Sequence, residues 1–84
     1  MNKKEIHEIL NKKGTYINNG FTGTIVGYCV YNYGDITLLI DSVDSTGRPM
    51  HGWYDIRCVE VENENGELEP ANDNYAAPHF REEK

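Results

Sequence analysis

A long β-rich segment, residues 21–31 (FTGTIVGYCVY), occupies the middle of this 84-residue chain. Thr, Ile, Val and Tyr, which strands favour, fill most of its positions. Gly23 and Gly27 interrupt the segment, and a glycine inside a strand commonly marks a bend, a bulge or a close backbone contact. A long strand with two such positions predicts a small sheet that curls into a barrel.

In the segments around this strand, the side-chain pattern repeats every two residues, as expected for strands. Further strands are predicted at residues 15–17, 36–43, 53–54 and 58–61. Within residues 36–43, Ile36, Leu38 and Ile40 share one face. The apolar spacing breaks at residues 55–57, which predicts a single helical turn before the last strand. We therefore expect a mostly β fold, a small barrel of about five antiparallel strands spanning residues 14–61.

The N-terminal segment has a helical pattern instead. Ile6, Ile9 and Leu10 lie on one stripe of a helix, and Gly14 follows as a stop signal. Residues 3–12 therefore predict a short α-helix, which forms an N-terminal unit at residues 1–13. A helix of this length is marginal alone, so we expect it to dock on the sheet.

The C-terminal segment, residues 62–84, is acidic and rich in breakers. It holds seven acidic residues and two prolines, a composition that favours a flexible tail. Two aromatic residues, Tyr75 and Phe80, support an alternative in which they anchor this tail on the barrel or on a partner. We expect disorder over most of the segment.

The net charge of −6 limits the classes of partner. Residues 14–61 carry two arginines against five acids, whereas binding to duplex DNA requires a cationic face. No apolar run approaches the roughly 18 residues of a membrane span, so we expect no membrane partner. The N-terminus has no apolar stretch typical of a secretory signal, so a cytoplasmic location is expected.

Metal binding and catalysis have weak support. His7, His51 and His79 fall in separate segments without ligand spacing, so no metal or other cofactor is expected. Cys29 and Cys58 can pair, but without an export signal two buried free thiols are expected. No serine lies in a nucleophile elbow, and burial would make Cys58 inert. We expect a binding protein and not an enzyme.

The arrangement of the segments resembles a small SH3-like barrel. The resemblance rests on residues 14–17, 21–28, 38–41 and 53–61, taken in that order. Short acidic proteins with such barrels are also similar to accessory proteins of bacteriophages and mobile elements. Some of these inhibit host defence nucleases, and others sequester nucleotide signals. The resemblance implies an anti-defence (anti-CRISPR-like) protein that acts in the host cytoplasm on a host protein, one that itself binds nucleic acid.

Aromatic residues beside the predicted turns are the candidate binding residues. Tyr, Trp and Arg dominate the energetics of protein interfaces. The candidates are Tyr31, Tyr33, Arg48, His51, Trp53 and Tyr54. The alternative is structural: Trp53 closes the mouth of the barrel, and the tyrosines are ordinary strand surface.

Three functions are consistent with these residues. The first is an inhibitor that acts through protein–protein contacts, with an acidic surface that complements a basic partner. The second is a homo-oligomeric sponge for a small nucleotide, in which Arg48 and the N-terminal lysines meet the phosphates. The third is a single-strand nucleic-acid binder with aromatic stacking platforms. The charge argues most strongly against the third function, and we favour the first.

Overall fold

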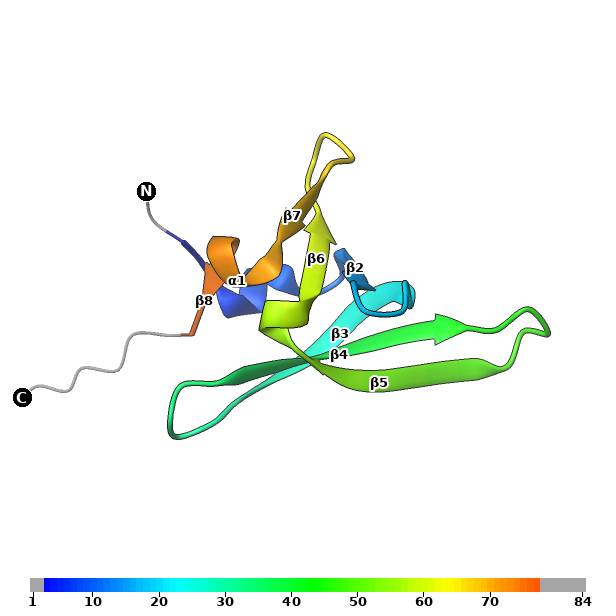
Figure 1. Ribbon diagram of the computed structural model, residues 1–84, viewed down its shortest axis with the longest axis horizontal. Helices are drawn as coiled ribbons and strands as arrows, with labels where there is room; N and C mark the ends of the chain where they lie inside the picture. Colours follow the sequence, from blue (N-terminus) through cyan, green and yellow to red (C-terminus); the bar gives the residue numbers. More distant parts are fainter. Residues whose placement is uncertain (1–2, 78–84) are drawn as a thin grey trace, which may run out of the picture.

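The computed structural model describes residues 3–77. Of these residues, 52% lie in strands and 15% in helices (Figure 1). The elements follow one another as β1 (Lys4–Glu5), η1 (Ile6–Ile9), β2 (Lys13–Tyr16), β3 (Thr22–Val30), β4 (Ile36–Val43), β5 (Pro49–Asp55), η2 (Ile56–Cys58), β6 (Val59–Glu62), β7 (Leu68–Pro70), α1 (Ala71–Asn74) and β8 (Tyr75–Ala76). Both η elements are 3₁₀ turns.

The main sheet is antiparallel and curls into a half-barrel. Its strand order is β5-β4-β3-β2-β6-β7, and a second, two-stranded sheet pairs β1 with β8 in parallel. The predictions of a mostly β fold, a curled antiparallel sheet and a short helix are confirmed. Five strands were expected, and β2 to β6 correspond to them; the sixth, β7, comes from the segment expected to be a flexible tail.

The two glycines of β3 have different roles. The register shifts between Ile25 and Gly27, so Val26 is an extra residue that forms a bulge. Gly23 has no space for a side chain, because an added Cβ would overlap the Asp41 carbonyl of β4. An added Cβ at Gly27 would lie 3.6 Å from the Leu39 Cβ, an ordinary contact. Close approach is therefore required at Gly23, whereas Gly27 only follows the bulge.

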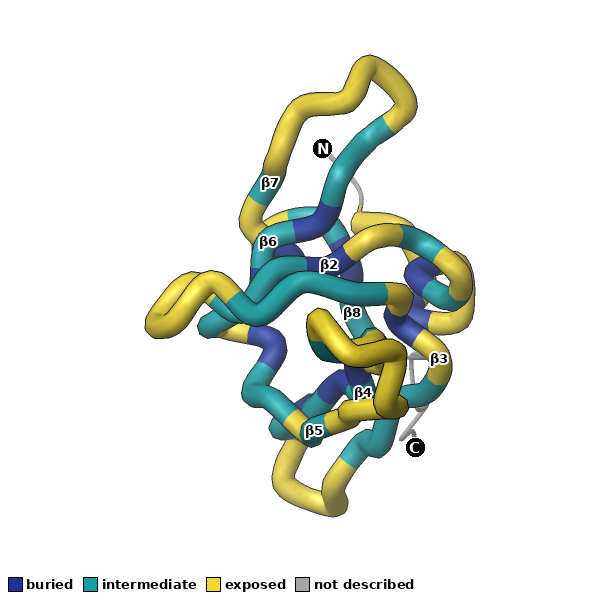
Figure 2. Tube along the Cα trace, turned by 90° about the vertical axis from the view of Figure 1, so that its right-hand side faces the viewer, coloured by how far each residue is buried: buried dark blue, intermediate teal, exposed yellow. Residues whose placement is uncertain are grey.

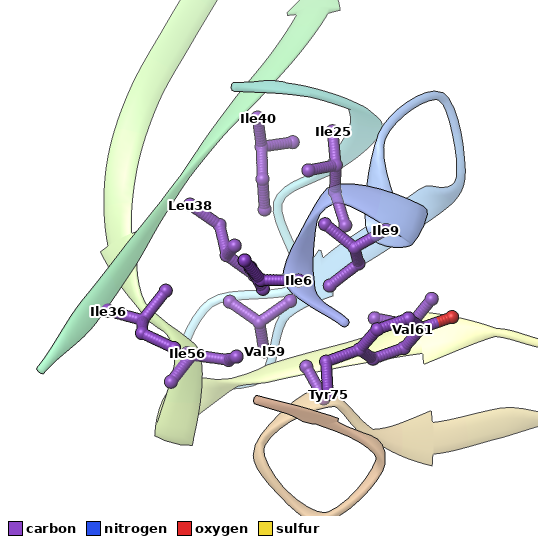
Figure 3. Packing of buried hydrophobic residues seen from close by; sticks show 11 residues of the cluster. Ile6, Ile9, Ile25, Ile36, Leu38, Ile40, Ile56, Val59, Val61 and Tyr75 are labelled. Atoms are coloured by element: carbon purple, nitrogen blue, oxygen red, sulfur yellow. The ribbon is translucent and has the colours of Figure 1, made fainter. Parts of the chain in front are cut away.

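The hydrophobic core lies inside the curl of the sheet. Alternate residues of β4 point inward, and both apolar side chains of η1, Ile6 and Ile9, are fully buried with them (Figure 3). Full burial of each such side chain stabilises the fold by about 1.5–3 kcal/mol. Figure 2 shows that the buried residues lie within the curl, while the hairpin turns are exposed.

Aromatic side chains close one opening of the half-barrel. Tyr54 of β5 stacks on Tyr16 of β2, with ring centroids 4.3 Å apart. The Phe21 ring lies 5.7 Å from the Tyr54 ring. This aromatic cluster (Tyr16, Phe21 and Tyr54) joins strands that do not pair in the sheet. It has the structural role that the sequence offered as an alternative for Trp53.

The N-terminal helix is shorter than predicted and is not an α-helix. The apolar stripe forms a four-residue 3₁₀ turn, after which Asn11 has a left-handed φ of 73°. The Asn11 N–H then donates to the Ile25 carbonyl at 2.7 Å, so the chain joins the sheet instead of continuing the helix. Gly14 lies buried within β2 and is not a helix stop.

The segment expected to be a flexible tail is folded as far as residue 77. β6 and β7 form a hairpin whose turn holds Gly66 at a φ of 81°. The Asn63 side chain accepts hydrogen bonds from the N–H groups of Asn65 and Glu67. Tyr75 then enters the core with 4% exposure, as the alternative interpretation of the aromatic residues predicted. Disorder is therefore wrong for residues 62–77; Phe80 lies outside the described residues.

Candidate interaction surface

The alternation along β5 separates the predicted binding residues onto two faces. Trp53 pairs with Leu39 and His51 pairs with Asp41, so both side chains lie on the outer face of the sheet. Tyr54 pairs with Leu38, whose side chain is fully buried, and therefore faces inward. Tyr54, one of the predicted binding residues, therefore does not share the outer face with His51 and Trp53.

An apolar row crosses three strands on the outer face. Leu39 of β4 and Trp53 of β5 are cross-strand partners, and Val26, the bulge residue of β3, precedes Gly27, which is the β3 partner of Leu39. We call Val26, Leu39 and Trp53 the Trp53 patch. Trp53 is 54% exposed and Val26 is 46% exposed. The glycine opposite Leu39, Gly27, adds no side chain and leaves the row open on that side. The patch is a shallow apolar surface with an indole at its edge.

Polar residues border the Trp53 patch on both sides. Asp41 and His51 form the next cross-strand pair toward the β4–β5 loop. In the other direction, Asp55 holds a bidentate pair with Arg57, with Nη2–Oδ2 and Nε–Oδ1 distances of 2.6 and 2.9 Å. Arg57 also lies 3.7 Å from Asp35, in the β3–β4 turn. An apolar centre with a polar border is typical of a protein contact surface.

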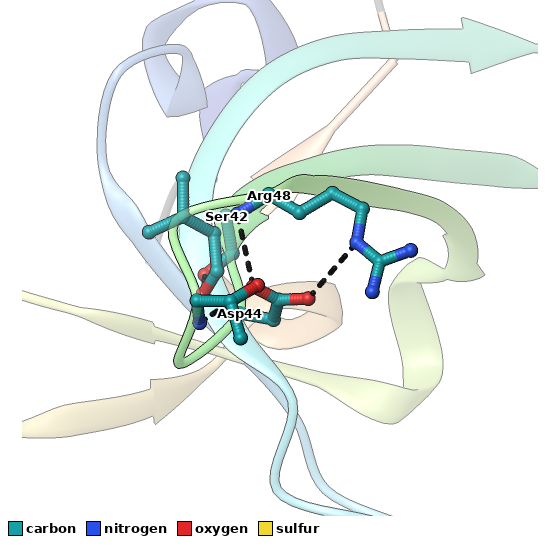
Figure 4. A network of polar contacts seen from close by, with 5 residues as sticks. Ser42, Asp44 and Arg48 are labelled. Carbon is teal, nitrogen blue, oxygen red and sulfur yellow. Dashed lines mark hydrogen bonds and ion pairs between the residues drawn. The ribbon is translucent and has the colours of Figure 1, made fainter.

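Arg48 belongs to the β4–β5 loop and is engaged there. The Asp44 carboxylate accepts hydrogen bonds from the Thr46 N–H, the Thr46 hydroxyl and the Arg48 N–H at 2.7–2.9 Å (Figure 4). The Arg48 Nε lies 3.4 Å from the same carboxylate. The hydroxyl of Thr46 and these N–H groups hold the pKa of Asp44 below its ordinary value. Arg48 therefore helps to order the hairpin loop, roughly 15 Å along β5 from Trp53.

Tyr31 and Tyr33 form a separate aromatic pair. Their rings are stacked with centroids 5.5 Å apart and an angle of 4° between the planes. They lie at the β3–β4 turn, at the opposite end of the eight-residue strand β4 from Arg48, roughly 25 Å away. The structure therefore brings the predicted residues together in two separate pairs, Tyr31 with Tyr33 at the turn and His51 with Trp53 on the outer face.

Two members of the Trp53 patch were missed in the sequence. Leu39 breaks the inward alternation of Ile36, Leu38 and Ile40, and an apolar residue at an outward position was a signal for an exposed contact. Val26 had no such signal, because its outward direction depends on the bulge in β3.

A cleft of about 200 Å³ lies between the N-terminal segment and the β6–β7 hairpin. Its charged lining consists of Lys4, Lys12, Glu64 and Glu69, beside the ring of Tyr75. Burial, with further contributions from nearby carboxylates, raises the pKa of Tyr75. Because carboxylates oppose the lysines, this cleft is a poor phosphate site.

Three further points concern the cysteines, metal binding and membrane spans. Cys29 and Cys58 are free, half-buried thiols. Between residues 3 and 77, no group of three or more His, Cys, Asp or Glu side chains is arranged to hold a metal ion. No helix in the same range is long and apolar enough to span a membrane. His79 lies outside the described residues.

Comparison of the chain with protein-family models, curated proteins and solved structures finds no significant match.

The Asp55–Arg57 pair predicts an acid-sensitive contribution to stability. Hydrogen bonds from the guanidinium and backbone N–H of Arg57 lower the pKa of Asp55. A lowered folded-state pKa gives a contribution that is present above the unfolded-state pKa, near 4, and is lost as pH falls below it. Melting temperatures measured from about pH 6 to pH 2 should therefore decline. The Asp55→Asn variant should decline less steeply, and equal slopes would contradict this assignment.

Proposed function

We propose that this chain is a non-enzymatic protein-binding module that uses the Trp53 patch as its contact surface. The observation that carries the proposal is the position of the only tryptophan of the chain, which is 54% exposed on the outer face. Since the core is built from isoleucine, leucine and valine with Tyr75, and Tyr54 with Tyr16 closes the half-barrel, Trp53 has no structural task there. Exposed tryptophans with apolar neighbours are typical centres of binding energy.

The finer architecture belongs to the same proposal. The strand order β5-β4-β3-β2-β6 and the one-turn η2 between β5 and β6 support an SH3-like barrel. In this interpretation, β7 extends the barrel beyond β6, and η1 fills the open side. The fold supplies a rigid platform, and the function depends on the outer face alone.

The charge of the chain indicates the class of partner. A net charge of −6 favours association with a basic protein surface, such as that of a nucleic-acid-binding protein. By covering such a surface the chain would act as an inhibitor, in line with the resemblance to phage accessory proteins. A nucleotide sponge has less support, because Arg48 is engaged with Asp44 and is not among the residues that line the cleft with Lys4 and Lys12.

The test is a comparison of Trp53→Ala with Tyr33→Ala. Affinity capture from the source cell, or from the host of a phage source, supplies the partner, whose Kd is then measured. We expect Trp53→Ala to raise the Kd about 30-fold, which corresponds to ~2 kcal/mol, with a change in unfolding free energy below ~1 kcal/mol. Tyr33 is 74% exposed at the distant β3–β4 turn, so Tyr33→Ala should leave the Kd unchanged.

Salt dependence separates the classes of partner. Binding to a basic protein should weaken as ionic strength rises, and its association rate should fall most. A nucleotide partner would instead raise the melting temperature with its concentration. Wild-type affinity in Trp53→Ala would show that the Trp53 patch is not the binding surface.

A further inference from the structure

The strand at one end of the main sheet, β5, has an open edge. All seven residues of β5 pair with β4 in one continuous register, from Asp55 with Thr37 to Pro49 with Val43. Within residues 3–77, no strand pairs with its other side. Natural proteins guard such edges with charged side chains, especially lysines, with prolines or with bulges. β5 has Pro49 at its first position and Asp55 at its last, with no lysine or bulge between them. The strand at the other end of the sheet, β7, has three residues.

The hairpin geometry identifies the backbone groups on this edge. The Asp44 N–H donates to the Arg48 carbonyl at 2.9 Å, so Asp44 and Arg48 form a hydrogen-bonded pair at the end of the β4–β5 ladder. Because antiparallel hydrogen bonds alternate, the even-numbered residues of β5 then bond to β4. The N–H and C=O groups of His51 and Trp53 and the N–H group of Asp55 therefore point away from the sheet, toward the open edge. The Asp55 C=O belongs to the N-cap of η2 and accepts the first hydrogen bond of that turn.

The side chains of these same three residues are self-complementary. All three lie on the outer face, in the order His, Trp, Asp at a spacing of two residues. If a second β5 runs antiparallel with the two-fold axis at Trp53, His51 of each copy lies opposite Asp55 of the other. The two Trp53 side chains then lie opposite each other. The Trp53 pair exchanges two backbone hydrogen bonds, and in each His51–Asp55 pair the Asp55 N–H donates to the His51 C=O.

The inner face tolerates the same register. Each Tyr54 ring lies over Gly52 of its own strand, where an added Cβ would overlap it. In the dimer, the residue opposite Tyr54 would be Gly52 of the other copy, which adds no side chain that could displace the ring. Tyr54 therefore keeps its stack on Tyr16. Asp55 also keeps Arg57. Its Oδ1 accepts from the backbone N–H and the Nε of Arg57, but its Oδ2 accepts only from Arg57 Nη2 and has a second lone pair for the His51 N–H.

We propose that two copies of this chain pair antiparallel through β5, with the two-fold axis at Trp53. The pairing joins the two β3–β4–β5 faces into one surface and places the two Trp53 patches side by side. It is independent of the external partner proposed above, because it needs only this chain. A two-fold arrangement of identical edges is the most common route to a closed dimer.

Sedimentation equilibrium of the full chain, from micromolar to millimolar concentration, tests this pairing. We expect a monomer–dimer equilibrium and a concentration-dependent change in the fluorescence of the only tryptophan. His51→Asp places like charges opposite Asp55 twice and should weaken the dimer about tenfold. His51→Lys places a cation opposite Asp55 and should dimerise at least as well as wild type.

A mixing experiment tests the register itself. His51→Asp places two carboxylates opposite each other in its own dimer, and Asp55→Lys removes the His51–Asp55 pairs from its own dimer. A mixture of the two variants creates an Asp–Lys pair and retains one His51–Asp55 pair, so the heterodimer should form preferentially. Circular dichroism of each variant establishes that it is folded. Monomers up to millimolar concentration, or dimers that His51→Asp leaves unchanged, would overturn the proposal.

Discussion

Replacing Tyr75 with alanine should lower the free energy of unfolding by about 3–5 kcal/mol. The Tyr75 ring is 4% exposed and belongs to the same core as Ile6, Ile9 and Val61. Its removal leaves a cavity between the N-terminal turn and the β6–β7 hairpin. Because a domain of this size has a total stability of about 5–10 kcal/mol, the variant should be partly unfolded at 37 °C. Urea unfolding followed by circular dichroism measures the change.

The matched control is Tyr33→Ala, which removes the same side chain from an exposed turn. We expect its unfolding free energy to change by less than ~1 kcal/mol. If Tyr75→Ala is as stable as this control, residues 62–77 do not contribute to the core. Limited proteolysis gives a second readout, since cleavage at the Asn65–Gly66 turn should rise in Tyr75→Ala and not in Tyr33→Ala.

Gly23→Ala should destabilise the protein by about 1–3 kcal/mol, although it adds a single methyl group. The new Cβ would overlap the backbone carbonyl of Asp41, which cannot move without disturbing the β3–β4 ladder. An obstructing side chain can rotate away, but a paired backbone group cannot. The shift in the midpoint of urea unfolding measures the effect.

Gly27→Ala is the control on the same strand. Its Cβ would meet Leu39 at an ordinary distance, and its φ is not in the left-handed region. The substitution should therefore be neutral or should stabilise the protein by up to ~1 kcal/mol, through the lower entropy of the unfolded chain. Equal destabilisation by the two alanines would mean that close approach at Gly23 is not the cause.

The local sequence pattern was sufficient to predict the central strands. The period of two residues predicted β4 at residues 36–43, and the structure has β4 at Ile36–Val43. The broken spacing at residues 55–57 predicted the turn that appears as η2 at Ile56–Cys58. Both succeed because strand alternation and its interruption depend on neighbouring residues alone.

The candidate surface was predictable only in part. Adjacent residues of a strand point to opposite faces, so the sequence already implied that Trp53 and Tyr54 separate. The association of Trp53 with Leu39 and Val26 required the register of three strands. That register depends on the loop ordered by Asp44 and on the bulge in β3.

The sequence by itself determined the β character of residues 14–61, the turns and the inward face of β4. Only the tertiary structure decided how the N-terminal and C-terminal segments fold. The acidic composition of residues 62–77 predicted disorder, but β1 pairs with β8 and buries Tyr75 against Ile6 and Ile9. Composition measures what a segment can bury alone, whereas this segment is stabilised by an apolar surface from the opposite end of the chain.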